Sequence, residues 1–548
     1  MPEVIVQYVG LGNEIFEGKT QSYQELLGGF AIVKATSLQI KQLATDSRVL
    51  YLEYPRDVFF ENCPYSGETK AGLKVCQVSE LNRICRDPDS SLTGEGVLMA
   101  YLDSGIDYRH PEFLNEEGKT RILEIFDLST EPGTVYTEEQ INEALLLPRQ
   151  EGNNIVPETD GSGHGTHVAG IGSGNSGVAP GTDILMVKLG RGVRQYSRTS
   201  ELMLGMDHCI RLAGQRNQPV VLNISYGNNY GAHNGTSMVE QYLDGVLNYA
   251  KAVIVVGSGN EGGGKGHFSG EVSAEKPVMA EFSVGEFQKG FGFSLFKDFP
   301  PDMGLELRQP GGTWQRIDRN VRQAVYPLRE GQVRVYNETP SPRAVFQEVY
   351  MELQPEESIA GDNPQAGYLL QGVWQIRVTT TRVQPWQVDI WLPVSESLSP
   401  LTGFLQPSPE TTLTIPSSAR RAVTVGAYDT RFGQVAAFSG RGYTWNDQLV
   451  KPDVVAPGVG IVSASPGGGY TERTGTSMAT PFVSGAAALL MEWGIIRGRD
   501  PFLYADKVKA YLTKGAEPLT EFSFYPNERA GWGALCIEGS LKEIPQNY

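Results

Sequence analysis

The hydrophobic pattern at the start of the chain indicates a small α+β unit. Three strand-like runs precede residue 55: EVIVQYV at 3–9, GFAIVKAT at 29–36 and VLYLEY at 49–54. A helix capped by Thr36 or Ser37 is expected between the second and third runs. Its expected buried residues are Leu38, Leu43 and Ala44. Residues 55–90 have no clear period, which predicts a linker or a cleavage region.

From Gly94 to about residue 262, apolar strands alternate with helical stretches. The strand runs are GVLMAYLDSG, TDILMVKLG, PVVLNISYG and AVIVVGSGN, and the helical stretches include SELMLGMDHCIRLAG and MVEQYLDGVLNYAK. This alternation predicts a parallel sheet with helices on both faces. Functional residues of such sheets collect at the carboxyl ends of the strands, where Asp103 and Asn260 lie.

Residues of about 264–410 break this rhythm. Short β runs follow one another without helices, among them EFSVGE, GFSLF, QVRVYNE, AVFQEVYMEL, GVWQIRVTTT and WQVDIWL. This pattern is typical of an antiparallel sandwich or jelly roll. The α/β pattern resumes at RAVTVGA, residues 421–427, so the β unit is an insertion.

The predicted fold class is therefore α/β, a parallel sheet with helices on both faces, plus an N-terminal α+β domain and an inserted antiparallel β domain. The expected boundaries are 1–60, 61–263, 264–410 and 411–548. A chain of 548 residues is too long for one compact core, which agrees with such a division.

Composition and charge exclude several classes of function. Hydrophobic residues make up 40% of the chain, and the formal net charge of −17 argues against nucleic-acid or anionic-membrane partners. No stretch approaches about 18 apolar residues, so no membrane span is expected. The start, MPEVIVQYVG, lacks a secretory signal pattern, which predicts synthesis in the cytoplasm.

The cysteines are odd in number and scattered. They are Cys63, Cys76, Cys85, Cys209 and Cys536. No spacing among them matches a zinc motif, and a secreted disulfide framework is normally even and denser. We expect free thiols from a reducing compartment, and no metal or cofactor.

Three segments carry candidate catalytic residues. Asp103 lies in YLDSGID (101–107), His164 in GHGTHVAG (163–170) and Ser477 in TGTSMATP (474–481). Each residue alone has a structural explanation, as a capping Asp, a packed His or a helix-cap Ser. Together, in the order Asp, His, Ser, they are the residue types of a nucleophile, its base and the group that orients the base.

With these motifs, the sequence resembles the subtilisin-like (subtilase) serine proteases over about residues 75–262 and 411–548. The resemblance implies a serine endopeptidase with Asp103, His164 and Ser477 as its triad. It also implies that Asn260, in VVGSGNEG (255–262), donates its amide to the oxyanion. Two alternatives remain: a catalytically silent pseudoprotease that acts as a signalling or binding scaffold, and an insert that docks carbohydrate or protein.

The same resemblance implies a substrate cleft and bears on calcium. An extended protein substrate would pair with the segment Ser225, Tyr226 and Gly227. The pocket for the residue before the scissile bond would be lined by Gly257, Ser258 and Gly259. The loop GIGSGNSGVAP at 170–180 is short and holds no carboxylate, so the family's calcium site is not expected there.

Several residues are assigned to structure instead of catalysis. The segment Asn234–Met238 repeats the letters GTSM, but no Ala-Thr-Pro and no Gly/Ala-rich helix follows it. His167 is expected to be a packed helix residue, and Asp107 is expected to stabilise a turn. The remaining histidines show no ligand spacing and are expected to be structural or exposed: His110, His208, His233 and His267.

Residues 1–60 resemble a subtilase propeptide, which in the family assists folding and then occupies the cleft as an inhibitor. Self-cleavage is expected between Tyr54 and about Ser66. This unit, the lack of a secretion signal and a calcium loop, and the β insertion together resemble the clostridial germination-specific (Csp-type) proteases. That resemblance implies a spore location, a spore-cortex lytic zymogen as substrate and a propeptide that stays bound; some members of this group are inactive.

Overall fold

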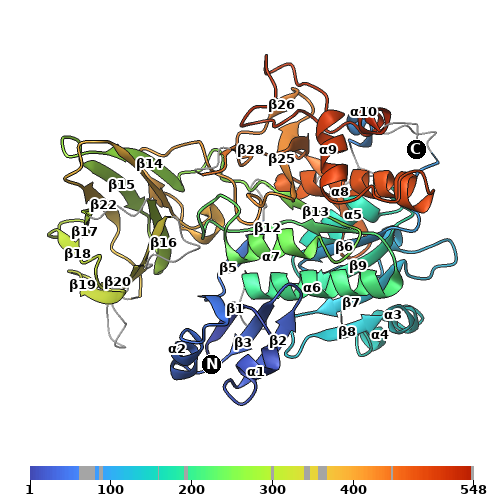
Figure 1. Ribbon diagram of the computed structural model, residues 1–548. Coiled ribbons are helices and arrows are strands. Elements are labelled where there is room, and N and C mark those ends of the chain that lie inside the picture. The colour runs from blue at the N-terminus through green and yellow to red at the C-terminus, as the bar shows by residue number, and fades with distance from the viewer. Residues whose placement is uncertain are drawn as a thin grey trace.

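The computed structural model describes three structural parts of the chain (Figure 1). The described residues are 1–60, 80–85, 91–157, 160–190, 196–297, 302–337, 346–355, 367–445 and 449–544. An N-terminal α+β unit lies against one side of a central α/β domain, and an inserted β domain stands beside it. This arrangement confirms the predicted fold class.

The N-terminal unit is a four-stranded antiparallel sheet in the order β2-β3-β1-β4, with two short helices. Its elements are β1 (Glu3–Tyr8), α1 (Gly12–Phe16), β2 (Ser22–Leu26), β3 (Phe30–Lys34), α2 (Ser37–Leu43) and β4 (Val49–Glu53). Thr36 caps α2 as predicted, but Leu38 and Ala44 are exposed, so their expected burial is wrong. The expected burial of Leu43 is confirmed, and Ile40 is buried with it, because residues three apart share one face of a two-turn helix.

The central sheet has the order β26-β25-β13-β11-β6-β9-β7-β8, with β29 beside β25. Its strands are β6 (Leu98–Asp103), β7 (Ile122–Asp127), β8 (Thr134–Thr137), β9 (Asp183–Lys188), β11 (Val220–Ile224), β13 (Ala252–Gly257), β25 (Val423–Asp429), β26 (Gln434–Val435) and β29 (Val454–Pro457). All pairs are parallel except those at the two edges, β7 with β8 and β25 with β26. The parallel sheet predicted from the buried-strand runs is thus confirmed.

Alternating residues of each central strand enter two different cores. In β6, Met99 and Tyr101 pack on one face, and Leu98, Ala100 and Leu102 pack on the other. The first face is covered by α5 (His164–Ser173), α8 (Thr476–Met491), α9 (Asp506–Lys514) and α10 (Ile537–Glu543). The second is covered by α6 (Thr199–Arg216) and α7 (Met238–Val246). Smaller helices are α3 (Glu138–Leu145), α4 (Arg149–Gly152), η2 (Pro111–Phe113), η3 (Ser395–Ser397) and η4 (Glu492–Ile496).

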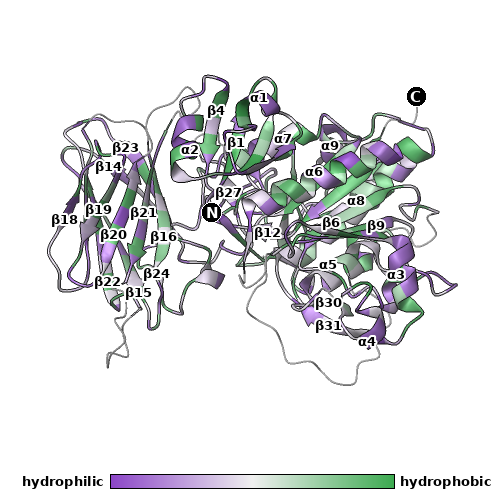
Figure 2. Cartoon of the chain, turned by 90° about the horizontal axis from the view of Figure 1, so that it is seen from below, coloured by the Kyte–Doolittle hydropathy of each residue, from purple (hydrophilic) through white to green (hydrophobic). Residues whose placement is uncertain are grey.

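The helix α8 runs through the first core, and every one of its residues is buried. Figure 2 shows the hydrophobic colour along α8 and the neighbouring β6. Within the described residues, the continuous helix Thr476–Ile496 is long and apolar enough to cross a membrane by length and composition. However, 83% of its most apolar window is buried inside the protein, which makes it the core helix of the α/β domain.

The insert consists of two antiparallel sheets around a shared apolar core. One sheet has the order β14-β23-β16-β21-β20-β19, and the other has the order β18-β17-β22-β15-β24. The strands are β14 (His267–Val272), β15 (Val278–Val284), β16 (Phe291–Lys297), β17 (Gly304–Arg308), β18 (Gln315–Ile317), β19 (Gln323–Pro327), β20 (Gln332–Asn337), β21 (Gln347–Gln354), β22 (Gly372–Thr379), β23 (Trp386–Trp391) and β24 (Gly403–Phe404). Phe282 and Trp374 of one sheet and Phe293 of the other meet in this core.

A buried aromatic stack joins the insert to the α/β domain. The ring of Trp391, at the end of β23, stacks between the rings of His233 and His267 at centroid distances of 4.3 and 4.5 Å. Asp389 accepts a hydrogen bond from Trp445 Nε1 at 2.7 Å. Burial lowers the pKa of His233 to about 4, so this histidine is neutral at physiological pH. Both histidines are structural, as expected.

Candidate active site

Candidate residues lie at the carboxyl ends of three neighbouring parallel strands. Ile224 of β11 pairs with Leu102 of β6 and with Val256 of β13. The residues that follow, Asp103, Ser225 and Gly257, are therefore neighbours at the carboxyl ends of these strands. Ligands of open parallel sheets bind at the carboxyl ends of the strands, where the sequence analysis placed these candidates.

His164 and Asp103 form a direct buried contact. His164 is the first residue of α5, and its Nδ1 lies 2.6 Å from Asp103 Oδ1. Both side chains are fully buried. The other ring nitrogen, Nε2, is buried without a hydrogen-bond partner among the described residues. A hydrogen bond from Nδ1–H to the carboxylate leaves Nε2 as the basic nitrogen, which a general base requires.

A second carboxylate, which the sequence analysis missed, fixes the start of α5. Asp160 Oδ1 accepts from Ser104 Oγ at 2.7 Å and from the Gly163 amide at 2.8 Å. Its Oδ2 accepts from the Thr166 amide at 2.8 Å. Ser104 follows Asp103, so this network joins the end of β6 to the first turn of α5. The available signal was an Asp just before a helix start, a capping pattern.

Close approach of α5 to β6 requires a glycine. A Cβ on Gly165 would lie 2.1 Å from the Gly105 carbonyl oxygen and 3.1 Å from the Asp103 Cβ. Any larger residue would push the helix, and His164 with it, away from Asp103. The small residues of the His motif are thus explained by the spacing of the Asp–His pair.

Ser477 lies in the first turn of α8, next to Ser225. Its Oγ lies 3.4 Å from the Ser225 carbonyl oxygen, and Ser225 Oγ lies 3.4 Å from the Ser477 carbonyl. The hairpin β30 (Ile461–Ser465) and β31 (Gly469–Arg473) leads into this turn. His167 Nε2 bonds the carbonyls of Ile461 and Thr471 at 3.1 Å each, tying α5 to the hairpin. His167 is fully buried, which confirms it as a packed residue, and this burial lowers its pKa to about 3.

Asn260 presents a buried amide donor beside Ser477. Its Oδ1 accepts from the Thr476 amide at 3.0 Å and from Thr476 Oγ1 at 3.2 Å. An amide N–H can only donate, so it fixes the oxygen of Asn260 toward Thr476 and turns Nδ2 away. Nδ2 is buried without a partner among the described residues. Such an orphaned donor fits an oxyanion that forms only during reaction.

Replacing Asn260 by alanine is expected to lower kcat for peptide hydrolysis by about 10²- to 10³-fold, with little change in KM, because the donor acts on charge that develops in the transition state. That magnitude is the one known for the corresponding donor of subtilisin. Steady-state kinetics on a peptide substrate measure it. Asn234→Ala, in the GTSM-like repeat, is the matched control, and an equal loss in both variants would contradict the role of Asn260.

The cleft beside these residues holds a strand of the N-terminal part of the chain. β5 (Asp57–Phe60) pairs antiparallel with β12 (Tyr226–Gly227) on one side and with β10 (Ser197–Arg198) on the other. The Phe60 ring lies 4.6 Å from the His164 ring and 4.5 Å from the Tyr226 ring. The predicted linker at 55–90 therefore begins with an ordered strand in the cleft, at the segment expected to pair with a peptide.

A small pocket opens next to Asn260. It is lined by Phe59, Phe60, Gly227, Asn260, Glu261, Val394, Glu396 and Thr414. The three residues predicted to line a substrate pocket, Gly257, Ser258 and Gly259, are not among them. Gly259 has a φ of +90°, and a Cβ there would lie 2.4 Å from Thr414 Cγ2. Gly257 ends β13, and the amide of the next residue, Ser258, bonds the Val425 carbonyl at 2.8 Å. Thr414 and Glu261 are wall residues that the sequence analysis missed.

The residues assigned to structure are placed accordingly. Ser237 of the GTSM-like repeat caps α7 in a capping box with Glu240, far along the chain from α8. Asp107 accepts from the Arg109 amide at 3.2 Å within its turn and from the Gly467 amide at 2.8 Å. His110 caps η2, and His208 contacts Glu124. These predictions are confirmed.

Comparisons with known proteins agree with this geometry. A model of the subtilase family matches residues 94–342 and 405–533, with its interruption inside the insert. A model of the Csp protease B prodomain matches residues 1–56. The solved structure of the CspB protease of Clostridium perfringens is 36% identical, with a TM-score of 0.77, covering 85% of this chain and 98% of that one.

Curated relatives are more distant. The minor extracellular protease Vpr of Bacillus subtilis is 24% identical over 83% of this chain and 52% of its own length. The subtilisin-like protease SBT3.5 of Arabidopsis thaliana is 24% identical over 89% of this chain and 66% of its own. The chain thus spans about half of Vpr and about two thirds of SBT3.5.

Proposed function

The chain belongs to the subtilase family of serine proteases, within it to those with a Csp-type prodomain, and from this premise we propose a specific activity. We propose that it is a serine endopeptidase with Asp103, His164 and Ser477 as its triad. Its protein substrate binds as an extended strand on β12, and its own N-terminal unit occupies the same cleft as an inhibitor.

The observation that carries the proposal is the position of β5. A peptide that is about to be cut must lie extended, with main-chain hydrogen bonds to the cleft, and with its scissile carbonyl near the nucleophile. β5 has this extended form between β12 and β10, and Phe60 packs on His164. The segment is therefore held as a substrate or product would be, and the bond cut lies shortly after Phe60.

The proposed reaction gives each of these side chains one role. His164 Nε2 accepts the Ser477 Oγ proton while Oγ attacks the carbonyl carbon, and Asp103 stabilises the imidazolium that forms. The Asn260 amide and the Ser477 backbone N–H donate to the oxyanion. His164 then gives the proton to the leaving amine, and water hydrolyses the acyl-enzyme in a second half of the same kind.

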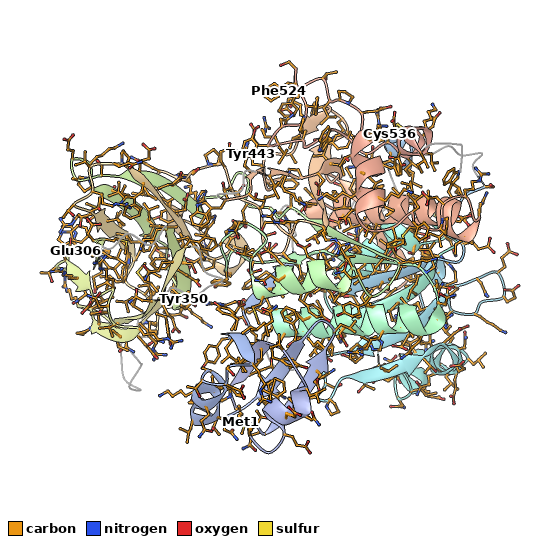
Figure 3. All side chains as sticks on the ribbon, viewed as in Figure 1. Met1, Glu306, Tyr350, Tyr443, Phe524 and Cys536 are labelled. Carbon is orange, nitrogen blue, oxygen red and sulfur yellow. The ribbon has the colours of Figure 1, made fainter. Side chains whose placement is uncertain are left out.

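Contacts outside the cleft support a propeptide that remains bound. The Leu27 amide donates to Asp207 Oδ1 at 2.8 Å, and Phe30 packs on Tyr242 at 5.3 Å between ring centroids. Arg56 crosses to the insert, where its guanidinium lies 4.4 Å from the centre of the Tyr350 ring. Tyr350 lies on the side of the insert that faces the rest of the chain (Figure 3). The insert thus contacts the connection between β4 and β5 through Tyr350.

The similarity to a CspB protease supports a narrower proposal for substrate and place. We propose that the protein cleaved is the zymogen of a spore-cortex lytic enzyme, and that the protein is associated with spores. A bound propeptide fits this role, because a protease stored with its target must be kept from cutting it early.

The proposal is tested by intact-mass spectrometry of the wild-type chain beside Ser477→Ala. The wild type is expected to give two pieces, with the first ending between residue 60 and about Ser66, a stretch that lies outside the described residues after Phe60. Ser477→Ala is expected to stay in one piece. A wild type that stays uncut, and that no fluorophosphonate probe labels after removal of residues 1–60, would be a pseudoprotease and would overturn the proposal.

A further inference from the structure

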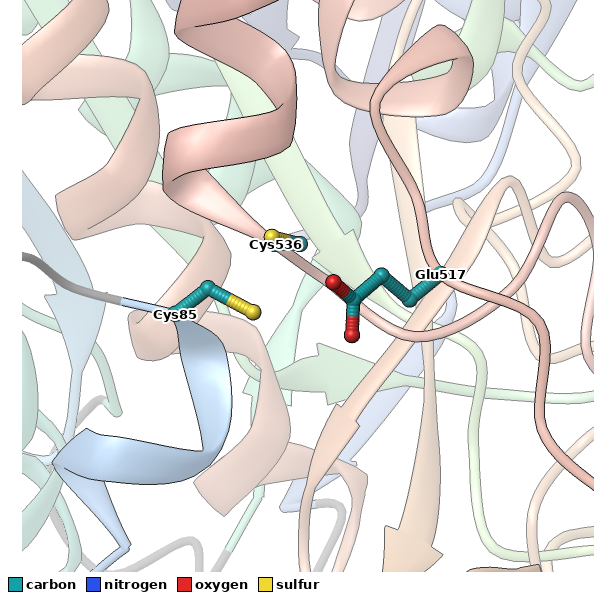
Figure 4. Close-up of side chains that lie close together, drawn as sticks. All are labelled: Cys85, Glu517 and Cys536. Carbon is teal, nitrogen blue, oxygen red and sulfur yellow. The ribbon is translucent and has the colours of Figure 1, made fainter.

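Two cysteines and a carboxylate from three distant segments meet on the outer side of the α/β domain. Cys85 ends the short helix η1 (Leu81–Ile84), Glu517 follows α9, and Cys536 precedes α10. The two Sγ atoms and a carboxylate oxygen of Glu517 lie within 4.8 Å of one another. Figure 4 shows the three side chains pointing toward a common centre.

We propose that Cys85, Cys536 and Glu517 form a binding site for a divalent cation that prefers thiolate ligands, and that this cation is Zn²⁺. A tetrahedral zinc with bonds of about 2.0 to 2.3 Å holds its ligand atoms roughly 3.3 to 3.8 Å apart, so a small contraction of the cluster completes the set. Two thiolates select zinc over calcium or magnesium. The fourth position falls to water, since Glu517 is exposed.

The backbone brings the three segments together without a cation. Glu517 and Ala534 exchange two backbone hydrogen bonds, at 2.8 and 2.7 Å. The Glu538 amide bonds the Cys85 carbonyl at 3.3 Å. Cys85 itself has a φ of +49°, the left-handed region that non-glycine residues seldom adopt. The ligand atoms are thus pre-positioned, which lowers the entropy lost when a cation binds.

The chemistry of the cluster suits a cation. The Gly539 amide donates to Cys536 Sγ at 3.3 Å, a bond that favours the thiolate. Burial raises the pKa of both cysteines, and the nearby Glu517 carboxylate raises it further. Binding of a divalent cation would release the two thiol protons, and its charge would offset that of the resulting thiolates and of the Glu517 carboxylate.

A bound cation would join residues 80–85, the first described segment after the cleft strand, to the C-terminal part of the α/β domain. Ile84 is already buried in the core that α5 and α8 cover, and Leu81 packs against the same core, so the segment has an apolar attachment. The cation would add a polar attachment of the same segment to the C-terminal part of the domain. This role is independent of the proposed protease chemistry.

The test is Co²⁺ and Zn²⁺ binding to the full-length chain, purified under reducing conditions and stripped of metal. We expect one Co²⁺ per chain, with a thiolate-to-cobalt charge-transfer band that Zn²⁺ abolishes. The band should be lost in Cys85→Ser and in Cys536→Ser, and Glu517→Gln should weaken binding at least about 10-fold. It should persist in Cys209→Ser and in the double variant Cys63→Ser/Cys76→Ser, whose positions lie outside the described residues.

A band that survives in Cys85→Ser and Cys536→Ser, or that vanishes with Cys63 and Cys76, would place the cation elsewhere and overturn the proposal. A Cys85–Cys536 disulfide in protein purified without reductant would also overturn it. Zinc X-ray absorption of the wild type needs no variant and covers the case of misfolding. We expect two sulfur ligands at about 2.3 Å, and a shell of nitrogen and oxygen alone would contradict the site.

Discussion

Replacing Ser477 by alanine is expected to lower kcat for peptide hydrolysis by about 10⁶-fold, the magnitude that loss of the nucleophile causes in subtilisin. The physical reason is that Ser477 Oγ, which lies against the Ser225 carbonyl, is the proposed attacking group, while the neighbouring hydroxyl, Thr476 Oγ1, donates to Asn260 Oδ1. Fluorophosphonate labelling should disappear together with activity. Both are measured on protein from which residues 1–60 have been removed.

The chain supplies a matched control in its second GTSM sequence. Ser237→Ala removes a helix cap of α7, which costs about 1 kcal/mol of stability, but leaves kcat unchanged. Activity that survives in Ser477→Ala and is lost in Ser237→Ala would reverse the assignment of the nucleophile. Equal circular dichroism spectra of both variants exclude misfolding as the cause.

Asp103→Asn is expected to lower kcat by about 10⁴-fold, the loss caused by the same change in a catalytic triad on another fold. Asp103 Oδ1 accepts from both His164 Nδ1 and the Ser104 amide, at 2.6 and 2.7 Å. An asparagine oxygen can hold both bonds, but the negative charge that stabilises the imidazolium is lost. If the amide turns over instead, its NH₂ faces Nδ1 and fixes the tautomer that cannot accept the serine proton.

The loss should appear in kcat with KM little changed, since the Asp103 side chain is fully buried and contacts His164. Steady-state kinetics at neutral pH measure it. Asp107→Asn is the matched control, because that carboxylate bonds a turn and the Gly467 amide. A fall in kcat for Asp107→Asn as large as that for Asp103→Asn would show that both act only through the fold.

The three short motifs predicted the pairing of Asp103 with His164 because each motif sets local geometry by its small residues. Only glycine fits at position 165, because any Cβ there would clash with the Gly105 carbonyl. The buried-strand runs fix which residues lie at the carboxyl ends of neighbouring strands. By contrast, Asp160 was missed. A carboxylate before a helix predicts a helix cap, but it does not predict which distant residue the same carboxylate also bonds. Its link to Ser104 exists only once the strand and helix are packed.

Length and separation explain the other differences. β5 has four residues, too few for a period, and it becomes a strand because β10 and β12 supply hydrogen bonds on both sides. Cys85 and Cys536 lie in opposite halves of the chain, so no linear spacing reveals that they meet. Leu38 was expected to be buried because it is apolar, while the short length of α2 leaves only one face for the core.

The short connection between β4 and β5 has a kinetic consequence. Only residues 54–56 separate the N-terminal sheet from the strand in the cleft. In the proposed autoprocessing, cleavage beyond β5 would leave the new carboxyl end tethered to the docked N-terminal unit, at an effective concentration on the order of millimolar. A protein substrate would have to compete with this tethered segment for the cleft. The rate of turnover would then depend on how often the N-terminal unit dissociates. That dissociation is first order, so added substrate would not accelerate it.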